Sequence, residues 1–173
     1  MRYNDFDVMK KHSKIIKEIL HQAKINVEKG YGPFMAVIYD DEGNIISQAS
    51  NSVIIDKCSN NHAEINAIKL AEKKLAAYDL SKYNLSLYVT AEPCMMCLGA
   101  ILWSGIKKVY YSISTKDVEE ITGFDEGIKP NWIDEFRNRG IEVTGEIEVD
   151  EGKKLLNDYV NSKREIYKPK REN

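Results

Sequence analysis

Apolar residues near the start of the chain recur three and four residues apart, which predicts an amphipathic helix over residues 7–29 with one buried face. The residues of this face are Val8, Ile15, Ile16, Ile19, Ala23 and Val27. A continuous apolar run at residues 34–39 follows, then the polar turn DDEGN and a second run at residues 44–49. The two runs predict a β-hairpin, in which Gly43 and Asn44 are expected to take a positive φ.

The remaining chain alternates between helical and extended patterns. Helices are expected at residues 62–77, 93–103, 115–122, 131–138 and 150–162, and strands at residues 85–90, 108–113 and 141–149. The helix at residues 93–103 is apolar on nearly every side, which predicts that it lies deep in the domain. Gly145 is expected to form a bulge in the last strand. This order of elements indicates an α/β fold, with helices on both faces of a mixed sheet.

Length and composition favour one globular domain. The chain has 173 residues and a mass of 19.8 kDa, which fits a single domain over residues 1–173. Its 43% hydrophobic and 30% charged residues argue against a disordered chain. A formal net charge of −2 and a pI near 6.0 argue against a broad basic face, so nucleic acid is not an expected partner.

The sequence gives no signal for a membrane or for secretion. The longest apolar run covers residues 94–103, far short of the ~18 residues that a membrane span needs. The first residues are polar and acidic, unlike a secretory leader. An odd number of cysteines, three, does not make a disulfide framework. These features predict a cytoplasmic protein.

Two short motifs carry the candidate chemistry. Each opens a predicted helix: His62 and Glu64 stand at one helix start, and Cys94 and Cys97 share the first turn of another. Free backbone N–H groups and the positive helix dipole at such a position lower the pKa of a thiol. Two thiolates and one imidazole nitrogen are ligands that zinc prefers. The spacing therefore predicts a zinc site formed by His62, Cys94 and Cys97.

Three protein ligands leave one position of a tetrahedral zinc open, as in catalytic zinc sites, where the fourth ligand is a water with a pKa lowered to about 7. Glu64 lies two residues after His62 and is well placed to take a proton from that water. A closed structural site that adds Cys58 as fourth ligand is one alternative. A redox role for Cys94 and Cys97 is another, but it leaves Glu64 unexplained.

The other histidines, His12 and His21, lie among lysine and glutamine residues of the first predicted helix. Both are expected on its solvated face.

The joint pattern H-A-E followed by P-C-x-x-C resembles the motif of zinc deaminases that act on bases. The chain is accordingly similar to the cytidine deaminase-like superfamily, and within it to bacterial guanine deaminases. The residues that carry this resemblance are Gly32-Pro33-Phe34, Asn51, His62-Ala63-Glu64, residues 91–100, Trp103, Gly123-Phe124-Asp125-Glu126 and residues 163–167.

The resemblance implies a three-layer α-β-α fold around a five-stranded mixed sheet. It implies zinc on His62, Cys94 and Cys97, with Glu64 as the proton shuttle. Base contacts would come from Asn51, Phe34, Ala63 and Trp103; Asn51 alone could instead be a turn residue, and either aromatic ring could simply pack in the core.

The Gly-Phe-Asp-acid segment implies a second acid that recognises guanine and transfers a proton. Both Asp125 and Glu126 fit this role, because the last acid here is Glu rather than the usual Asp. Met35 and the loop at residues 57–61 also depart from the family pattern.

Relatives often form homodimers that exchange the C-terminal segment, so a homodimer is expected, with residues 150–173 exchanged and Tyr167 closing the partner's pocket.

The expected activity is hydrolytic deamination of a free nucleobase, guanine to xanthine and ammonia. Three alternatives stay open: a tRNA adenosine deaminase, a deaminase of cytosine or another small aminated ring, and a structural zinc-binding module without activity.

Overall fold

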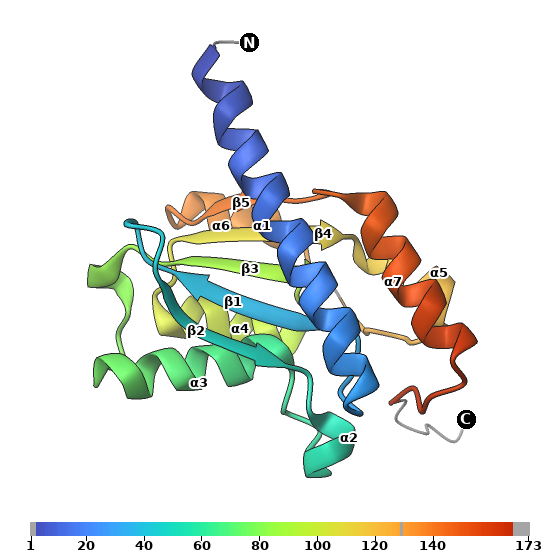
Figure 1. Cartoon of the computed structure of the whole chain (residues 1–173). Helices are drawn as coiled ribbons and strands as arrows, with labels where there is room; N and C mark the ends of the chain where they lie inside the picture. Colours follow the sequence, from blue (N-terminus) through green and yellow to red (C-terminus); the bar gives the residue numbers. More distant parts are fainter. Residues whose placement is uncertain (1–2, 129, 168–173) are drawn as a thin grey trace.

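The computed structural model describes residues 3–128 and 130–167, whose strands form one five-stranded mixed sheet (Figure 1). The strand order is β2-β1-β3-β4-β5. The strands are β1 (Met35–Tyr39), β2 (Ile45–Ser50), β3 (Ser86–Ala91), β4 (Lys108–Ile113) and β5 (Glu142–Thr144). β1 pairs antiparallel with β2 and with β3, whereas β3, β4 and β5 run parallel. The expected mixed sheet of five strands is therefore confirmed.

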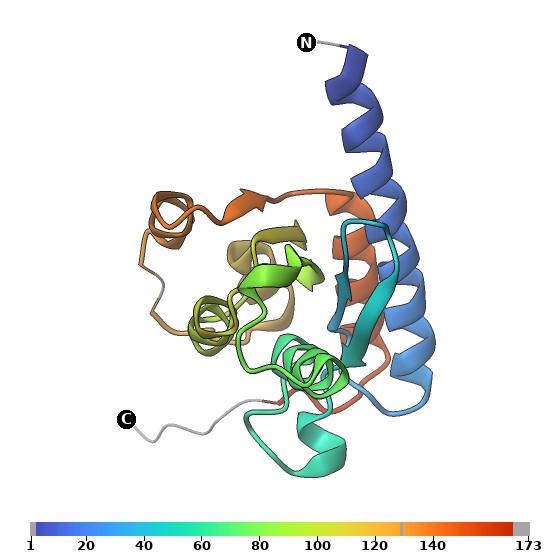
Figure 2. The same cartoon turned by 90° about the vertical axis from the view of Figure 1, so that its left-hand side faces the viewer.

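Helices cover both faces of the sheet, which gives the expected three layers (Figures 1 and 2). The helices are α1 (Tyr3–Glu28), α2 (Val53–Asp56), α3 (Ala63–Leu75), α4 (Met95–Ser104), α5 (Thr115–Thr122), α6 (Trp132–Asn138) and α7 (Val149–Asn161), with a 3₁₀ turn at Ser81–Tyr83. α1 and α7 lie on one face, and α3 and α4 lie on the other (Figure 2). The short helix α2 has no counterpart among the predicted elements.

Each face has its own apolar core, because side chains of a strand alternate between the two faces. On the α3 and α4 face, Ile38, Leu87 and Val109 of the sheet pack against Ala67 and Ile101. On the α1 face, Val37, Tyr88 and Tyr110 pack against buried residues of α1 and α7. The apolar spacing that predicted the first helix thus corresponds to a real buried stripe.

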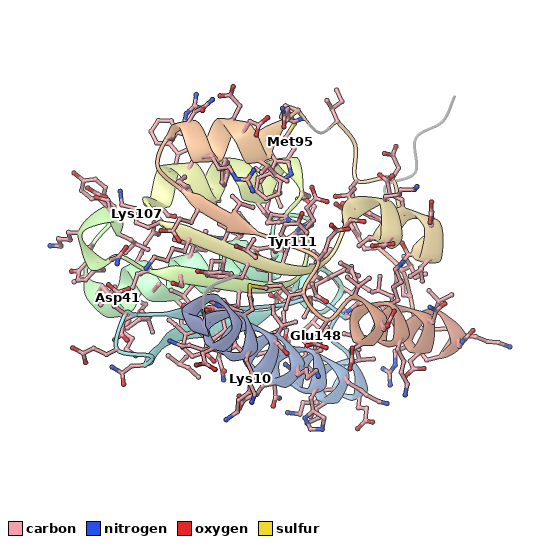
Figure 3. The ribbon with its side chains drawn as sticks, turned by 90° about the horizontal axis from the view of Figure 1, so that it is seen from above. Lys10, Asp41, Met95, Lys107, Tyr111 and Glu148 are labelled. Carbon is pink, nitrogen blue, oxygen red and sulfur yellow. The ribbon has the colours of Figure 1, made fainter. Side chains whose placement is uncertain are left out.

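Glu148, just before α7, ties this last helix to α1. Figure 3 labels Glu148 between these two helices. Its carboxylate accepts a hydrogen bond from Ser13 Oγ and lies 3.3 Å from Lys17 Nζ. The hydrogen bond with Ser13 lowers the pKa of Glu148, and Lys17 lowers it further.

The last strand is shorter than predicted, and Gly145 explains where it ends. β5 spans Glu142–Thr144, whereas the apolar alternation predicted a strand through residue 149. A Cβ atom on Gly145 would lie 1.9 Å from Cζ of Tyr111, so only glycine fits where the chain crosses this ring. Glu146 and Glu148 then take positive φ angles of 58° and 59°, which interrupts the extended backbone, although the N–H of Ile147 still donates to the carbonyl of Tyr111 at 3.2 Å.

Two other expectations about local structure are wrong. In the hairpin turn, Gly43 has a φ of 87°, but Asn44 is not among the residues with positive φ. Helix α4 is not deeply buried on all sides, since Trp103 is 90% exposed and Leu102 is 40% exposed. A helix that covers a sheet buries one side only, whatever residues stand on the other.

His12 is buried, contrary to the expected solvated position, whereas His21 is exposed as expected. The Nδ1 atom of His12 lies 2.8 Å from the hydroxyl oxygen of Tyr88, and its ring stacks on Tyr110 at a centroid distance of 4.1 Å. His12 lies four residues before Ile16, which puts it on the buried stripe of α1.

No helix in the described part of the chain combines the length and the apolar character needed to cross a membrane.

Candidate active site

The starts of two neighbouring helices bring the predicted zinc ligands together. His62 is the N-cap residue of α3, and Cys94 is the N-cap residue of α4. The Nδ1 atom of His62 lies 3.5 Å from Sγ of Cys94 and 3.7 Å from Sγ of Cys97, and the two sulfurs lie 3.6 Å apart. Among the described residues, these three side chains are the one group of histidine, cysteine and acidic residues close enough to share a metal ion.

These distances fit a tetrahedral zinc. With Zn–S bonds of ~2.3 Å and a Zn–N bond of ~2.0 Å, tetrahedral angles place the ligand atoms about 3.5–3.8 Å apart. A disulfide would need an S–S distance of ~2.05 Å, and all three cysteines are free. Cys58 is exposed and lies outside the group, so the closed site with Cys58 as fourth ligand is wrong. The chain thus has a zinc site of His62, Cys94 and Cys97 with its fourth position open to solvent or substrate.

The pKa values of two of the ligand side chains, Cys94 and His62, differ from their ordinary values. The hydrogen bond that Cys94 shares with Cys97, together with His62, lowers the pKa of Cys94 to about 4. This makes Cys94 a thiolate, the form that binds zinc. Desolvation would lower the pKa of His62, but the hydrogen bond with Cys94 and the charge of Glu64 outweigh it and raise this pKa.

Glu64 lies in the first turn of α3 and is buried, with 8% of its surface exposed. Burial raises its pKa, and the neighbouring charge of Cys94 adds to the effect. Glu64 also lines the same cavity as His62 and Cys94. A carboxylate in this position can exchange protons with a molecule bound beside the metal.

One cavity gathers most of the predicted site residues. Besides His62, Glu64 and Cys94, its wall contains Phe34, Asn51, Glu126 and Tyr167. Ile54, Thr90, Thr122, Phe124 and Tyr159 also line it. The cavity lies where β3 ends and α4 begins, so the metal ligands form one side of it.

Asn51 follows β2 and is held by two main-chain hydrogen bonds to the segment that precedes β1. Its N–H donates to the carbonyl of Phe34 at 2.9 Å, and its carbonyl accepts from the N–H of Gly32 at 3.0 Å. Its Oδ1 accepts from the N–H of Val53 at 3.2 Å, and Asn51 is one of the residues that line the cavity. A Cβ atom on Gly32 would lie 3.1 Å from this Oδ1, which explains the small residue there.

The structure separates the two acids after α5. Glu126 lines the cavity, and its N–H donates to Glu119 Oε1 at 3.1 Å. Asp125 is exposed, and its carboxylate accepts from the N–H of Gly127 at 2.8 Å. Of the pair, Glu126 therefore has the position that a second acid needs.

The C-terminal segment closes part of the cavity of its own chain. Ile166 and Tyr167 line the wall, and the ring of Tyr167 lies 6.1 Å from that of Phe124. The carbonyl of Glu165 accepts from the hydroxyl of Tyr159 at 2.5 Å, which fixes the segment on α7.

Two residues expected to contact the base lie elsewhere. Trp103, on the outer side of α4, is 90% exposed and does not line the cavity. Ala63 is buried directly after His62, with 1% of its surface exposed, and is also outside the cavity wall. Helix α4 is apolar on all sides, so its sequence could not indicate which side faces the site.

Glu92 is a cavity residue to which the sequence assigned no role. Its Oε1 accepts from Nε1 of Trp132 at 2.6 Å, and its Oε2 accepts from the N–H and the hydroxyl of Thr115 at 2.7 and 3.0 Å. It therefore connects the residues before Cys94 to α5 and α6. Glu92 adjoins the cysteine motif, but nothing in the local sequence points to Trp132.

Comparison with known proteins agrees with this geometry. Residues 9–113 match the family described as the cytidine and deoxycytidylate deaminase zinc-binding region. The match covers more than half of the chain and includes the histidine and both ligand cysteines.

Relatives of known activity cover most of the chain. A guanine deaminase of Bacillus subtilis is 40% identical over 124 residues, which is 71% of this chain and 77% of the relative. A tRNA-specific adenosine deaminase of Haemophilus influenzae is 33% identical over 153 residues, 88% of this chain and 84% of the relative. A solved structure of guanine deaminase from Nitrosomonas europaea has a TM-score of 0.80 at 38% identity, covering 83% of this chain and 81% of the other.

Proposed function

Because the chain belongs to the family of the cytidine and deoxycytidylate deaminase zinc-binding region and is a hydrolytic deaminase, we propose that its substrate is free guanine. The products are then xanthine and ammonia. The observation that carries the proposal is the cavity in which Glu64, Asn51 and Glu126 surround the open side of the zinc ligands. Its partial closure by Tyr167 of the same chain favours a small ring over a polynucleotide. The guanine deaminase relatives support the same choice.

The reaction exchanges an amino group for oxygen on one ring carbon. His62, Cys94 and Cys97 would hold the zinc ion, which when bound would supply a water of lowered pKa near that carbon. Glu64 accepts a proton from the water and delivers it to the neighbouring ring nitrogen. A carbon–oxygen bond forms, and Glu64 or Glu126 then carries the proton of the new hydroxyl group to the amine. The carbon–nitrogen bond breaks as the hydroxyl becomes a carbonyl, and the amine leaves as ammonia. Guanine and water are thereby converted to xanthine and ammonia with all atoms accounted for.

Asn51 and the aromatic side chains hold the ring. The Nδ2 group of Asn51 donates to a ring nitrogen or a carbonyl oxygen of the base. Phe34 offers a flat apolar surface in the same wall. Tyr167 and Phe124 keep bulk water from the ring once it is bound.

The test is an ammonia-release screen of the zinc-loaded protein against guanine, cytosine, adenine, their nucleosides and tRNA. Guanine should give the largest kcat/KM. A larger value for another base overturns the substrate and leaves the chemistry intact. A larger kcat/KM for tRNA supports instead the activity of the tRNA-specific adenosine deaminase relative. No ammonia from any compound favours a structural zinc module.

We propose further that the chain forms a homodimer. On α4, Met95, Leu102 and Trp103 expose 48%, 40% and 90% of their surfaces, an apolar area that a second copy could cover. Exchange of the C-terminal residues 150–173 also stays a prediction; the part after residue 167 lies outside the described residues, and Tyr167 lines the cavity of its own chain. Light scattering of the wild type and of Trp103→Glu tests the dimer: a monomeric wild type contradicts it.

A further inference from the structure

The segment from Asn51 to His62 connects the proposed base contact to a zinc ligand. It contains α2 and the loop at residues 57–61, and residues 55–60 are exposed. In Figures 1 and 2, α2 lies at one end of the molecule, beyond the layers of the sheet and its helices. The middle of this segment therefore gains little from packing in the core, whereas Ser52 and Val53 near its start are buried, with 7% and 4% of their surfaces exposed.

One side chain, Asn66, bonds to the residues that flank both ends. Asn66 lies on α3, where its main-chain N–H makes the ordinary helical bond to the carbonyl of His62 at 3.0 Å, and its side chain makes the further contacts. Its Nδ2 group lies 3.2 Å from the carbonyl of Ser50 and 3.1 Å from Oγ of Ser52, the two neighbours of Asn51. The same group lies 3.3 Å from the carbonyl of Asn61, the residue before His62.

The acceptors of Asn66 are themselves linked. The N–H of Ser52 donates to the carbonyl of Asn61 at 3.0 Å. Both Oγ of Ser52 and Nδ2 of Asn61 donate to Oδ2 of Asp56, at 2.5 and 2.8 Å. Ser52 is buried, with 7% of its surface exposed, so its polar atoms depend on these partners. The amide of Asn66 is the one element of this network that comes from α3.

We propose that Asn66 is a positioning residue, which sets the distance between Asn51 and the zinc ligand His62. Asn66 is not among the residues that line the cavity beside the metal ligands. This role of Asn66 rests on the proposed function in one respect, namely that Asn51 binds the base. If so, Asn66 controls how the ring is presented to the metal, whichever base is bound.

The experiment compares Asn66→Ala with the wild type, using the base that the wild type turns over fastest. Losing hydrogen bonds to an exposed segment should raise KM about tenfold and change kcat less. Zinc content should stay at one ion per chain. Hydrogen exchange of the amides of residues 51–61 should accelerate, while that of the rest of α3 stays unchanged. Asn157→Ala is the matched control, because the amide of Asn157 donates to the carbonyl of Lys153 within the same helix, α7, at 2.9 Å.

A double-mutant cycle separates positioning from general stability. If Asn66 acts through Asn51, then Asn66→Ala should have little further effect on KM in an Asn51→Ala background. An equal effect in both backgrounds overturns the inference, as does an unchanged KM or an unchanged exchange rate in residues 51–61. If Asn66→Ala does not fold, Asn66→Gln decides, because it shifts the amide by one methylene and should still raise KM.

The outcome is independent of the substrate. If the preferred base is not guanine, the proposed function fails. The KM values of the Asn66 variants and the wild type are then compared with the preferred base as substrate. If no base releases ammonia, the hydrogen exchange of residues 51–61 alone decides. If guanine is the substrate and the Asn66 variants behave as wild type, only the inference about Asn66 fails.

Discussion

The two faces of the sheet each hold a histidine away from bulk solvent, and the two residues have opposite environments. On the α1 face, His12 is bonded to the hydroxyl of Tyr88 and stacks on Tyr110. On the other face, His62 stands at a helix start beside two sulfurs. His12 is the more buried of the two, yet only His62 borders the cavity with a carboxylate in reach. Burial alone therefore does not make a histidine reactive.

The pKa values show the same contrast. Burial lowers the pKa of His12, and the charge of Lys11 adds to this effect. The pKa of His62 rises although it is also desolvated, because Cys94 and Glu64 favour its charged form. On the α1 face, His12 thus packs in the core as a neutral ring. On the other face, ionisable groups surround His62.

The largest effect on activity is expected from Glu64→Gln. This change removes the proton-transfer group beside His62 and leaves the α1 face of the sheet unaltered. Turnover should fall about 10²–10⁴-fold, the usual contribution of a positioned acid or base. Zinc content and thermal stability should stay close to wild type, because the amide keeps the shape of the carboxylate. Ammonia release, metal analysis and a thermal melt measure the three quantities. Retained turnover would remove Glu64 from the mechanism.

His12→Phe, on the other face of the sheet, should lower the stability of the protein and leave its turnover unchanged. A phenyl ring keeps the stacking on Tyr110 but leaves the Tyr88 hydroxyl without its partner, which should cost about 1–3 kcal/mol. Urea unfolding measures this loss, and kcat/KM for the preferred base should stay unchanged. His21→Gln, at an exposed position of the same helix, is the control. A fall in activity beyond the loss of folded protein would contradict the separation of the two faces.

The dependence of stability on pH sharpens the same comparison. Because the folded protein lowers the pKa of His12 from its ordinary 6.5, the unfolded chain binds the proton more readily. The wild type should lose this contribution as the pH falls below 6.5 toward the depressed folded value. His12→Phe has no titrating group at this position. The difference in the free energy of unfolding between the two proteins should therefore narrow from pH 8 to pH 5. A difference that stays constant or widens contradicts the neutral, buried state of His12.

The smallest effect is expected from Cys58→Ser. Cys58 is exposed and lies outside the metal group, so zinc content, stability and ammonia release should all match wild type. Loss of zinc in this variant would restore the closed site with four protein ligands.

The sequence predicted the chemistry of one face well, because its residues are close in the chain. His62 and Glu64 share one helix start, and Cys94 and Cys97 share another, so the spacing alone predicts the zinc site. The buried position of His12 could also have been read from the sequence. It lies in step with Ile16 and Ile19, although its polar neighbours suggested solvent.

Other features depend on residues far apart in the chain. The bond between Glu92 and Trp132 spans forty residues, and no local pattern predicts it. The short strand β5 ends because Gly145 passes the ring of Tyr111 from another strand. The resemblance implied that Trp103 contacts the base, whereas it is 90% exposed, and a helix with apolar residues on all sides has no periodicity to show which side is buried.

The placement of the two tryptophans gives the protein an intrinsic fluorescent probe. Trp103 is almost fully exposed, whereas Trp132 is 4% exposed and donates to Glu92 in the cavity wall. These are the only two indole groups in the sequence. A soluble quencher such as iodide should therefore suppress the emission of Trp103 first. The remaining signal then comes from Trp132 and reports optically on the cavity wall in the native enzyme, without an added label.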